Sequence, residues 1–231
     1  MSSEPIVFLP GMMRDARLFA PQIDGLSHER AVMVAPVHLG ERVEEIASTI
    51  LDMTPRRFAL CGLSLGGMVA IELIRRAPDR VSRLCLMDTN PMSETLVSAA
   101  EREPQIIAAR TGRLEQIMRE DLIPNYLAET PFKAHILELM VDMALSLGPE
   151  VFVRQSRALQ KRRDQQSLLH NIKCPTLILC GAQDQIALPK RHKFMVKLIE
   201  PAKLGVIENA GHLPTLEQPK ATIAALRDWL D

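Results

Sequence analysis

The chain has 231 residues, 47% of them hydrophobic, which suits one large α/β domain with a substantial core. Its 28 basic and 28 acidic residues leave no net charge and no acidic tail, so nucleic acid is not an expected partner. No apolar run approaches the roughly 18 residues of a membrane span, and the N-terminal "MSSEPIVFLPGMM" lacks the basic segment of a secretory signal. We therefore expect a cytoplasmic protein without a membrane partner.

Six short, continuously apolar runs predict strands, at 6–10, 31–37, 57–62, 83–88, 176–181 and 204–208. Because these runs do not alternate polar and apolar residues, we expect strands buried on both faces, as in a parallel sheet covered by helices. Segments with a helical period, at 42–53, 67–77 and from Pro219 to the end, lie between or after them. This alternation predicts a doubly wound α/β sheet of about six strands.

The alternation breaks between residues 91 and 172, where helical periods dominate and no strand is evident. We interpret 91–172 as a helical insertion into a core made of 1–90 and 173–231. An insertion after a strand's carboxyl end would lie over the edge where open α/β sheets bind ligands. Four prolines are expected to divide it: Pro104, Pro124, Pro131 and Pro149.

The four cysteines are expected to be buried, reduced thiols, because three of them lie in apolar runs, as suits a cytoplasmic protein. None is spaced as a CxxC pair, so no metal site is expected. They are Cys61, Cys85, Cys174 and Cys180.

The segment "FALCGLSLGGMVAIEL" places Ser64 between a predicted strand and a predicted helix. A sharp turn there would project the serine above the sheet, and it requires small neighbours, which Gly62 and Gly66 supply. The helix that follows directs its N-terminal N–H groups toward the serine oxygen. Ser64 is therefore the candidate nucleophile, and the N–H of Leu65 is a candidate donor to an oxyanion.

A serine needs a base to become a nucleophile. His212 is the best candidate, because it lies in a loop after the last predicted strand, framed by Gly211 and Pro214. The other five histidines are more typical of surface or packing positions: His28, His38, His135, His170 and His192.

The base needs an acid to orient it, and Asp184 follows the strand that ends at Gly181. The order Ser64, Asp184, His212 along the chain is one that strand–turn–helix serine enzymes use. Asp88 competes for the role, because it also leaves the carboxyl end of a strand. Its alternative role is to hydrogen-bond the backbone of a loop near the site.

The second oxyanion donor is expected in the loop after the first strand, "FLPGMMRDARLF". Gly11 lets the backbone turn there, which makes the N–H of Met12 the candidate. The alternative is that Met12 only lines the pocket. Asp15 is interpreted as a helix N-cap.

Taken together, the sequence resembles the α/β-hydrolase superfamily, and in particular its serine hydrolases and esterases with a helical cap. The resemblance implies Ser64 as nucleophile, His212 as base and Asp184 as its orienter, an oxyanion hole from Met12 and Leu65, and a cap over the site. It covers nearly the whole chain outside the insertion and rests on five segments in order: "LPGMMRDARLF", "CGLSLGGMVAIEL", "LCLMDTNP", "CPTLILCGAQDQIALP" and "NAGHLPTLEQP".

Two features depart from the usual pattern of that superfamily. Pro10-Gly11 stands where many relatives have His-Gly, so a histidine side chain is absent there although the backbone donor is expected to remain. The chain also begins directly at the strand before the oxyanion loop, without the extra hairpin of most relatives. This predicts a trimmed sheet whose N-terminal edge is exposed or covered by a partner.

The leading hypothesis is a serine hydrolase that cleaves a carboxylic ester of a small molecule through an acyl-enzyme, with no metal or organic cofactor. The same residues would also support C–C bond, lactone, amide or thioester hydrolysis, or perhydrolysis. A non-catalytic small-ligand receptor on the same fold is a further alternative. Monomer and homodimer are equally compatible with the sequence.

Overall fold

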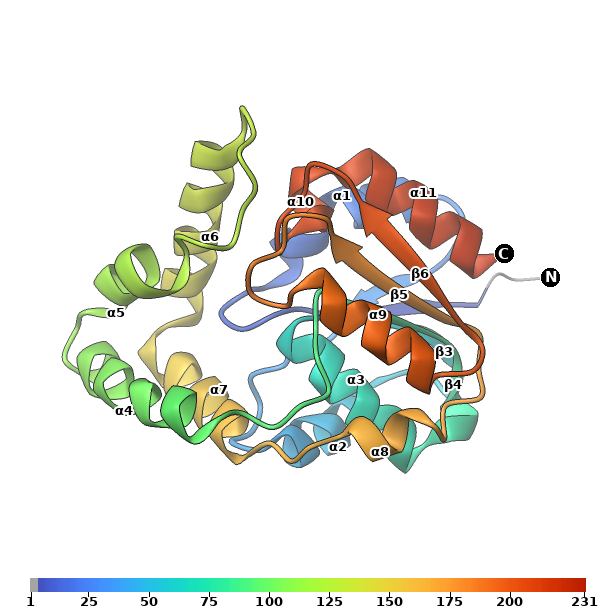
Figure 1. Ribbon diagram of the computed structural model, residues 1–231, viewed down its shortest axis with the longest axis horizontal. Helices are drawn as coiled ribbons and strands as arrows, with labels where there is room; N and C mark the ends of the chain where they lie inside the picture. The colour runs from blue at the N-terminus through green and yellow to red at the C-terminus, as the bar shows by residue number, and fades with distance from the viewer. Residues whose placement is uncertain (1–3) are drawn as a thin grey trace.

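The computed structural model describes residues 4–231 and contains a sheet of six strands, all parallel to their neighbours (Figure 1). All the predicted strands are present, and their order across the sheet is β2-β1-β3-β4-β5-β6. The strands are β1 (Ile6–Leu9), β2 (Val32–Val34), β3 (Phe58–Leu63), β4 (Val81–Met87), β5 (Thr176–Gly181) and β6 (Ala202–Ile207). The predicted parallel sheet of about six strands, flanked by helices, is confirmed.

Burial on both faces holds for the central strands, and every residue of β1, β3 and β5 is buried. The expectation is wrong for the edge strands. All of β2 is half-buried, and Leu204 and Val206 in β6 are 37% and 41% exposed. An edge strand has a neighbour on one side only, so helices cover it less completely. The exposed Lys203 in β6 discourages pairing with another chain at that edge.

Helices cover the two faces of the sheet. Figure 1 shows α1 and α11 on one side, where they pack together, and α2, α3, α8 and α9 on the other. The apolar stripe of α2 is buried, as its helical period requires. The helices of this part are η1 (Ala16–Phe19), α1 (Ala20–Leu26), α2 (Val43–Met53), α3 (Leu65–Arg76), η2 (Pro78–Arg80), α9 (Pro189–Leu198), α10 (Pro214–Glu217) and α11 (Pro219–Leu230).

Residues 91–172 contain helices and no strand. Figure 1 shows α4 to α7 gathered beyond the carboxyl ends of the strands, whereas α8 returns to the sheet. Pro104 does not divide this segment as expected, because it lies inside α4. Both Pro104 and Ala100, the residue whose carbonyl loses its helical hydrogen-bond donor, are exposed, which makes the proline tolerable. The helices are α4 (Leu96–Arg110), α5 (Leu114–Gln116), η3 (Ile117–Leu122), α6 (Lys133–Leu147), α7 (Pro149–Lys161) and α8 (Gln166–Leu169).

The cysteines form no disulfide: Cys61, Cys85 and Cys180 are buried free thiols, and Cys174 is half-buried. None of the helices between residues 4 and 231 combines the length and apolar character that crossing a bilayer requires.

Candidate active site

Ser64 lies at the turn between β3 and α3, with a φ of 54° and a ψ of −116°. This is a region of the backbone map that a serine rarely adopts, so the surrounding packing must hold it there. A Cβ atom added to Gly62 would lie 2.3 Å from the carbonyl oxygen of Gly66, and one added to Gly66 would lie 2.1 Å from that of Leu9. The chain therefore passes too close to itself at this turn for any larger residue.

The structure brings Ser64, His212 and Asp184 together at the carboxyl edge of the sheet, after β3, β6 and β5. The Oγ of Ser64 lies 3.0 Å from Nε2 of His212, and Nδ1 of the same ring lies 2.9 Å from Oδ2 of Asp184. His212 and Asp184 are 1% and 2% exposed, so their interaction is shielded from water. The hydroxyl, the imidazole and the carboxylate form one continuous hydrogen-bonded chain.

The environment of Asp184 keeps its carboxyl group ionised. Burial by itself would raise the pKa, but the attraction of His212 and the hydrogen bond to it outweigh burial and lower the pKa to about 2. The other oxygen, Oδ1, accepts hydrogen bonds from the N–H groups of Ile186 and Ala187, at 2.8 and 3.0 Å. The carboxylate is thus held in orientation as well as in charge.

Asp88 lies close by but makes no hydrogen bond to the imidazole. Its Oδ1 accepts a hydrogen bond from the N–H of Gly181 at 2.9 Å, so it bonds the backbone at the end of strand β5 and not that of a loop, and its Oδ2 is buried. Burial first, and repulsion by the Asp184 carboxylate second, hold the pKa of Asp88 well above its usual range. Asp88 therefore releases its proton at a higher pH than Asp184 does.

Asp88, Asp184 and His212 are also the one group of possible metal ligands within residues 4–231, with their ligand atoms within 4.8 Å of one another. His212 and Asp184 already direct these atoms at each other, which suits a proton relay better than a cation.

The loop after β1 lies directly against Ser64, since a Cβ on Gly11 would be 3.3 Å from the serine Cβ. Within the described part of the chain, neither the N–H of Met12 nor that of Leu65 donates a hydrogen bond. Both donors are thus free to meet a developing oxyanion. Asp15 caps η1 as expected, accepting the N–H of Arg17.

Two residues at the site escaped prediction, and the first is Gln155 of α7. Its Oε1 accepts the N–H of Met13 at 2.8 Å, and its Nε2 donates to the carbonyl of Val37 at 3.1 Å. This fully buried amide fixes the backbone next to Met12 from a distant helix. In the sequence, a glutamine in a polar helix carries no signal that separates it from a surface residue.

The second is Glu217 of α10, which supports the loop of His212. Its buried carboxylate accepts the N–H groups of Gly211, Leu213 and Ala128, at distances of 2.7 to 3.0 Å. Burial raises its pKa, although these hydrogen bonds oppose the rise. The carboxylate thereby ties the histidine loop to the chain before α6.

Replacement of Glu217 by Gln is expected to lower the free energy of unfolding by about 1–3 kcal/mol, because the amide has one acceptor oxygen instead of two and its NH₂ group would face backbone donors. Denaturant unfolding measures the change. Glu208→Gln, at an exposed position of the same loop, is the matched control. Equal unfolding curves for the two variants would contradict the supporting role of Glu217.

The arrangement of strand, turn, helix and hydrogen-bonded side chains invites comparison with known families. A model of the "Alpha/beta hydrolase family" matches residues 6–226, nearly the whole chain. The chain belongs to the alpha/beta hydrolase family. The predicted superfamily is thus confirmed, and with it the prediction that the protein is a hydrolase.

Individual relatives of this alpha/beta hydrolase cover most of its length. It is 28% identical over 217 residues to a "Pimeloyl-[acyl-carrier protein] methyl ester esterase" from Neisseria meningitidis serogroup C, covering 90% of this chain and 82% of the relative. It is 26% identical over 226 residues to a "2-hydroxy-6-oxo-2,4-heptadienoate hydrolase" from Pseudomonas putida, covering 96% and 81%. Among solved structures, a thermophilic esterase from Thermogutta terrifontis matches with a TM-score of 0.89 and 28% identity, covering 99% and 90%.

Proposed function

We propose that this alpha/beta hydrolase cleaves carboxylic esters of small molecules through an acyl-enzyme formed on Ser64. Ester hydrolysis, the reaction class predicted from the sequence, agrees with the family and with the esterases among its relatives. The observation that carries the proposal is the unbroken chain from the Ser64 hydroxyl through His212 to Asp184. Methyl esters are the first substrates to test, because the curated relatives named above include methyl ester esterases.

In the first half of the proposed reaction, Oγ of Ser64 attacks the ester carbonyl while Nε2 of His212 takes its proton. The ionised Asp184 holds the ring with Nδ1–H toward itself and stabilises the imidazolium that forms. The carbonyl oxygen becomes an oxyanion and accepts hydrogen bonds from the N–H groups of Met12 and Leu65. His212 then passes the proton to the departing alcohol oxygen, which leaves the acyl group on Ser64.

In the second half, a water molecule takes the place of the alcohol. His212 removes its proton, the hydroxide adds to the acyl carbonyl, and the same two N–H groups stabilise the second oxyanion. Collapse of this intermediate releases the carboxylic acid and returns the proton to Ser64. No other acid or base is needed, since His212 accepts and returns the proton in both halves of the reaction.

We also propose that residues 91–172 act as a cap domain on the core of 1–90 and 173–231. Two contacts support this capping role. The side chain of Gln155 accepts a hydrogen bond from the loop after β1, and the carbonyl of Tyr126 accepts a hydrogen bond from the N–H of His212 at 2.6 Å. The Tyr126 ring also packs edge-on against the imidazole, with ring centres 4.8 Å apart. We further propose a cytoplasmic location for the enzyme, which its four free cysteines support.

Labelling with a fluorophosphonate probe, followed by peptide mapping, tests the proposal before any natural substrate is known. We expect modification on the peptide that contains Ser64, and hydrolysis of short p-nitrophenyl and methyl esters by the same preparation. Absence of labelling and of turnover, with small ligands still bound, would favour the receptor alternative.

A further inference from the structure

Three arginines and one glutamate meet beside the proposed site, and we call them the arginine cluster: Glu94, Arg102, Arg162 and Arg191. Glu94 pairs with Arg102 through hydrogen bonds of 2.6 to 3.0 Å, and their side chains are 7% and 16% exposed. Arg162 interacts electrostatically with the other three members. The cluster thus unites the loop after β4, helix α4, the end of α7 and helix α9.

Two arginines of the cluster contact the sulfur atoms of methionines that lie near Ser64 in the fold. Nη1 of Arg102 lies 3.9 Å from Sδ of Met12, the residue whose N–H is the proposed oxyanion donor. Nη1 of Arg162 lies 2.8 Å from Sδ of Met68, one turn along the helix that begins after Ser64. The two arginines therefore each contact a residue of an element next to Ser64, the loop after β1 and helix α3.

The charge of the cluster is not balanced within the protein. One carboxylate faces three guanidiniums, and no ion pair in the described part of the chain involves Arg162 or Arg191. The nearest partners of these two are the thioethers of Met68 and Met92, which accept hydrogen bonds only weakly. Nε of Arg162 is buried with no partner, and burial lowers the pKa of this group to about 10. A half-buried cation without an anion is costly, and an anionic ligand at this position would offset that cost.

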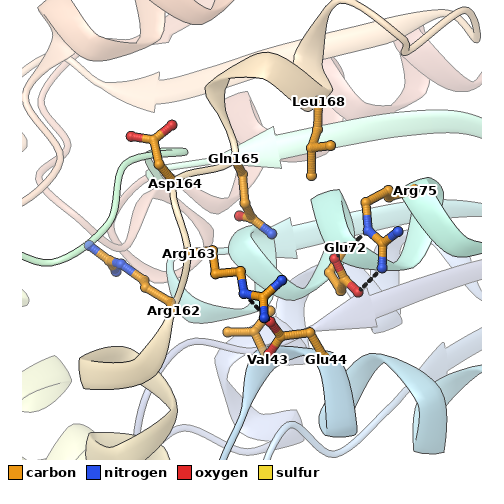
Figure 2. Close-up of a pocket in the computed structure, with 9 residues that line it drawn as sticks. All are labelled: Val43, Glu44, Glu72, Arg75, Arg162, Arg163, Asp164, Gln165 and Leu168. Atoms are coloured by element: carbon orange, nitrogen blue, oxygen red, sulfur yellow. Dashed lines mark hydrogen bonds and ion pairs between the residues drawn. The ribbon is translucent and has the colours of Figure 1, made fainter.

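The neighbouring Arg163 differs from Arg162 in the direction and the partner of its side chain. Arg162 and Arg163 both line a cavity of about 250 Å³ between α2, α3 and the segment before α8, and Figure 2 shows the Arg163 side chain directed toward Val43 and Glu44, whereas that of Arg162 points away from the other labelled side chains. Arg163 is 80% exposed and lies 3.7 Å from Glu44. Ser64 does not line this cavity, so Arg163 is separate from the proposed active site.

We propose that the arginine cluster binds an anionic oxygen group of the substrate, a carboxylate or a phosphate, at the end away from the ester bond. This inference rests on the proposed function and narrows it: the preferred substrate is an ester that carries a negative charge. Planar guanidiniums suit the bidentate recognition of such groups. The ligand would supply an anionic partner for Arg162 and Arg191, which form no ion pair within the described residues.

Half-esters test the inference in the wild-type enzyme. Monomethyl esters of linear dicarboxylic acids of increasing chain length are compared with the dimethyl ester of each acid, which lacks the charge. We expect kcat/KM at the best length to be about tenfold or more higher for the half-ester. Equal values for the two esters at every length would overturn the carboxylate form of the proposal, and equal values for esters with and without a phosphate tail would overturn the phosphate form.

Arg162→Gln removes one charge, and Arg163→Gln is its matched control. The first is expected to lower kcat/KM for the half-ester by about ten- to hundredfold and to leave the dimethyl ester within about twofold. The second should change neither, and Arg162→Lys should retain part of the preference. Thermal unfolding identifies a variant that fails to fold. Equal losses on charged and uncharged esters in a folded Arg162→Gln would contradict the inference.

Binding without turnover separates this inference from the proposed chemistry. Binding of two probes to the Ser64→Ala variant is measured by calorimetry, with and without the additional Arg162→Gln substitution. The probes are the dicarboxylate of the best chain length and inorganic phosphate. Tighter binding of one probe, weakened by the second substitution, identifies the anion, and it would do so even if no ester were hydrolysed. Failure of both probes to bind would overturn the anion site and leave ester hydrolysis standing on its own assays.

Discussion

The Ser64→Ala variant is expected to lose on the order of 10⁴-fold or more in kcat for any ester that the wild type hydrolyses. Without Oγ there is no nucleophile, and His212 and the oxyanion donors can assist only direct attack by water. KM should change little, because the substrate touches the removed oxygen mainly in the transition state. Steady-state kinetics with a chromogenic acetate ester measures both constants.

The control is Ser167→Ala, at an exposed serine in α8, which should keep full activity. The turn at Ser64 must also survive the substitution. Alanine has a Cβ like serine, so the packing of Gly62 and Gly66 around the turn is unchanged, and the unfolding temperature should move little. Residual activity of more than about one hundredth of wild type would mean that another group performs the attack.

The sheet was predictable because parallel strands buried on both faces leave continuous apolar runs in the sequence, as in β1 and β3. The same rule failed at β6, where a run that begins at Leu204 is apolar although its side chains are partly exposed. Hydrophobicity reports what a residue prefers, whereas position at the sheet edge depends on strand order. That order is set by contacts between distant segments, which a pattern along the chain does not contain.

The positions of Ser64, Asp184 and His212 were predictable because the carboxyl ends of parallel strands meet at one edge of the sheet. The prediction favoured Asp184 over Asp88, but the strand pattern alone does not separate the two, since both follow strands that are neighbours, β5 and β4. The structure separates them by the direction of each carboxyl group: one faces Nδ1 of His212 and the other the N–H of Gly181.

The supporting polar residues could not be predicted, for a related reason. Gln155 bonds a backbone group 142 positions away, and Glu217 one 89 positions away. Arg162 lies 94 positions from Met68. A polar side chain in a helix normally faces solvent, so only the tertiary packing of α7 and α10 reveals that these side chains face inward.

Asp184→Asn is expected to lower kcat by about 10⁴-fold while leaving the fold intact. The amide has nearly the shape of the carboxylate, but its NH₂ group would favour the wrong tautomer of His212, with the proton on Nε2. Ser64 would then face a donor and could not give up its proton. The loss should persist across the pH range in which the wild type is active, and a pH profile of kcat/KM with a neutral ester measures it.

Asp88→Asn is the matched comparison, and its expected result is the opposite. The pKa of Asp88 is raised well above its usual range, so between the pKa values of the unfolded and folded states the folded protein binds more protons at this residue than the unfolded chain does. As the pH rises from the pKa of the unfolded state toward that of the folded state, Asp88 therefore lowers the free energy of unfolding by an increasing amount. Asparagine, which resembles the neutral acid, removes this cost. The variant should keep most of its activity and gain stability over wild type as the pH rises, in unfolding curves measured from acid to neutral pH. If instead Asp88→Asn abolished turnover while Asp184→Asn preserved it, the acid that serves His212 would be Asp88, and the relay through Asp184 would be wrong.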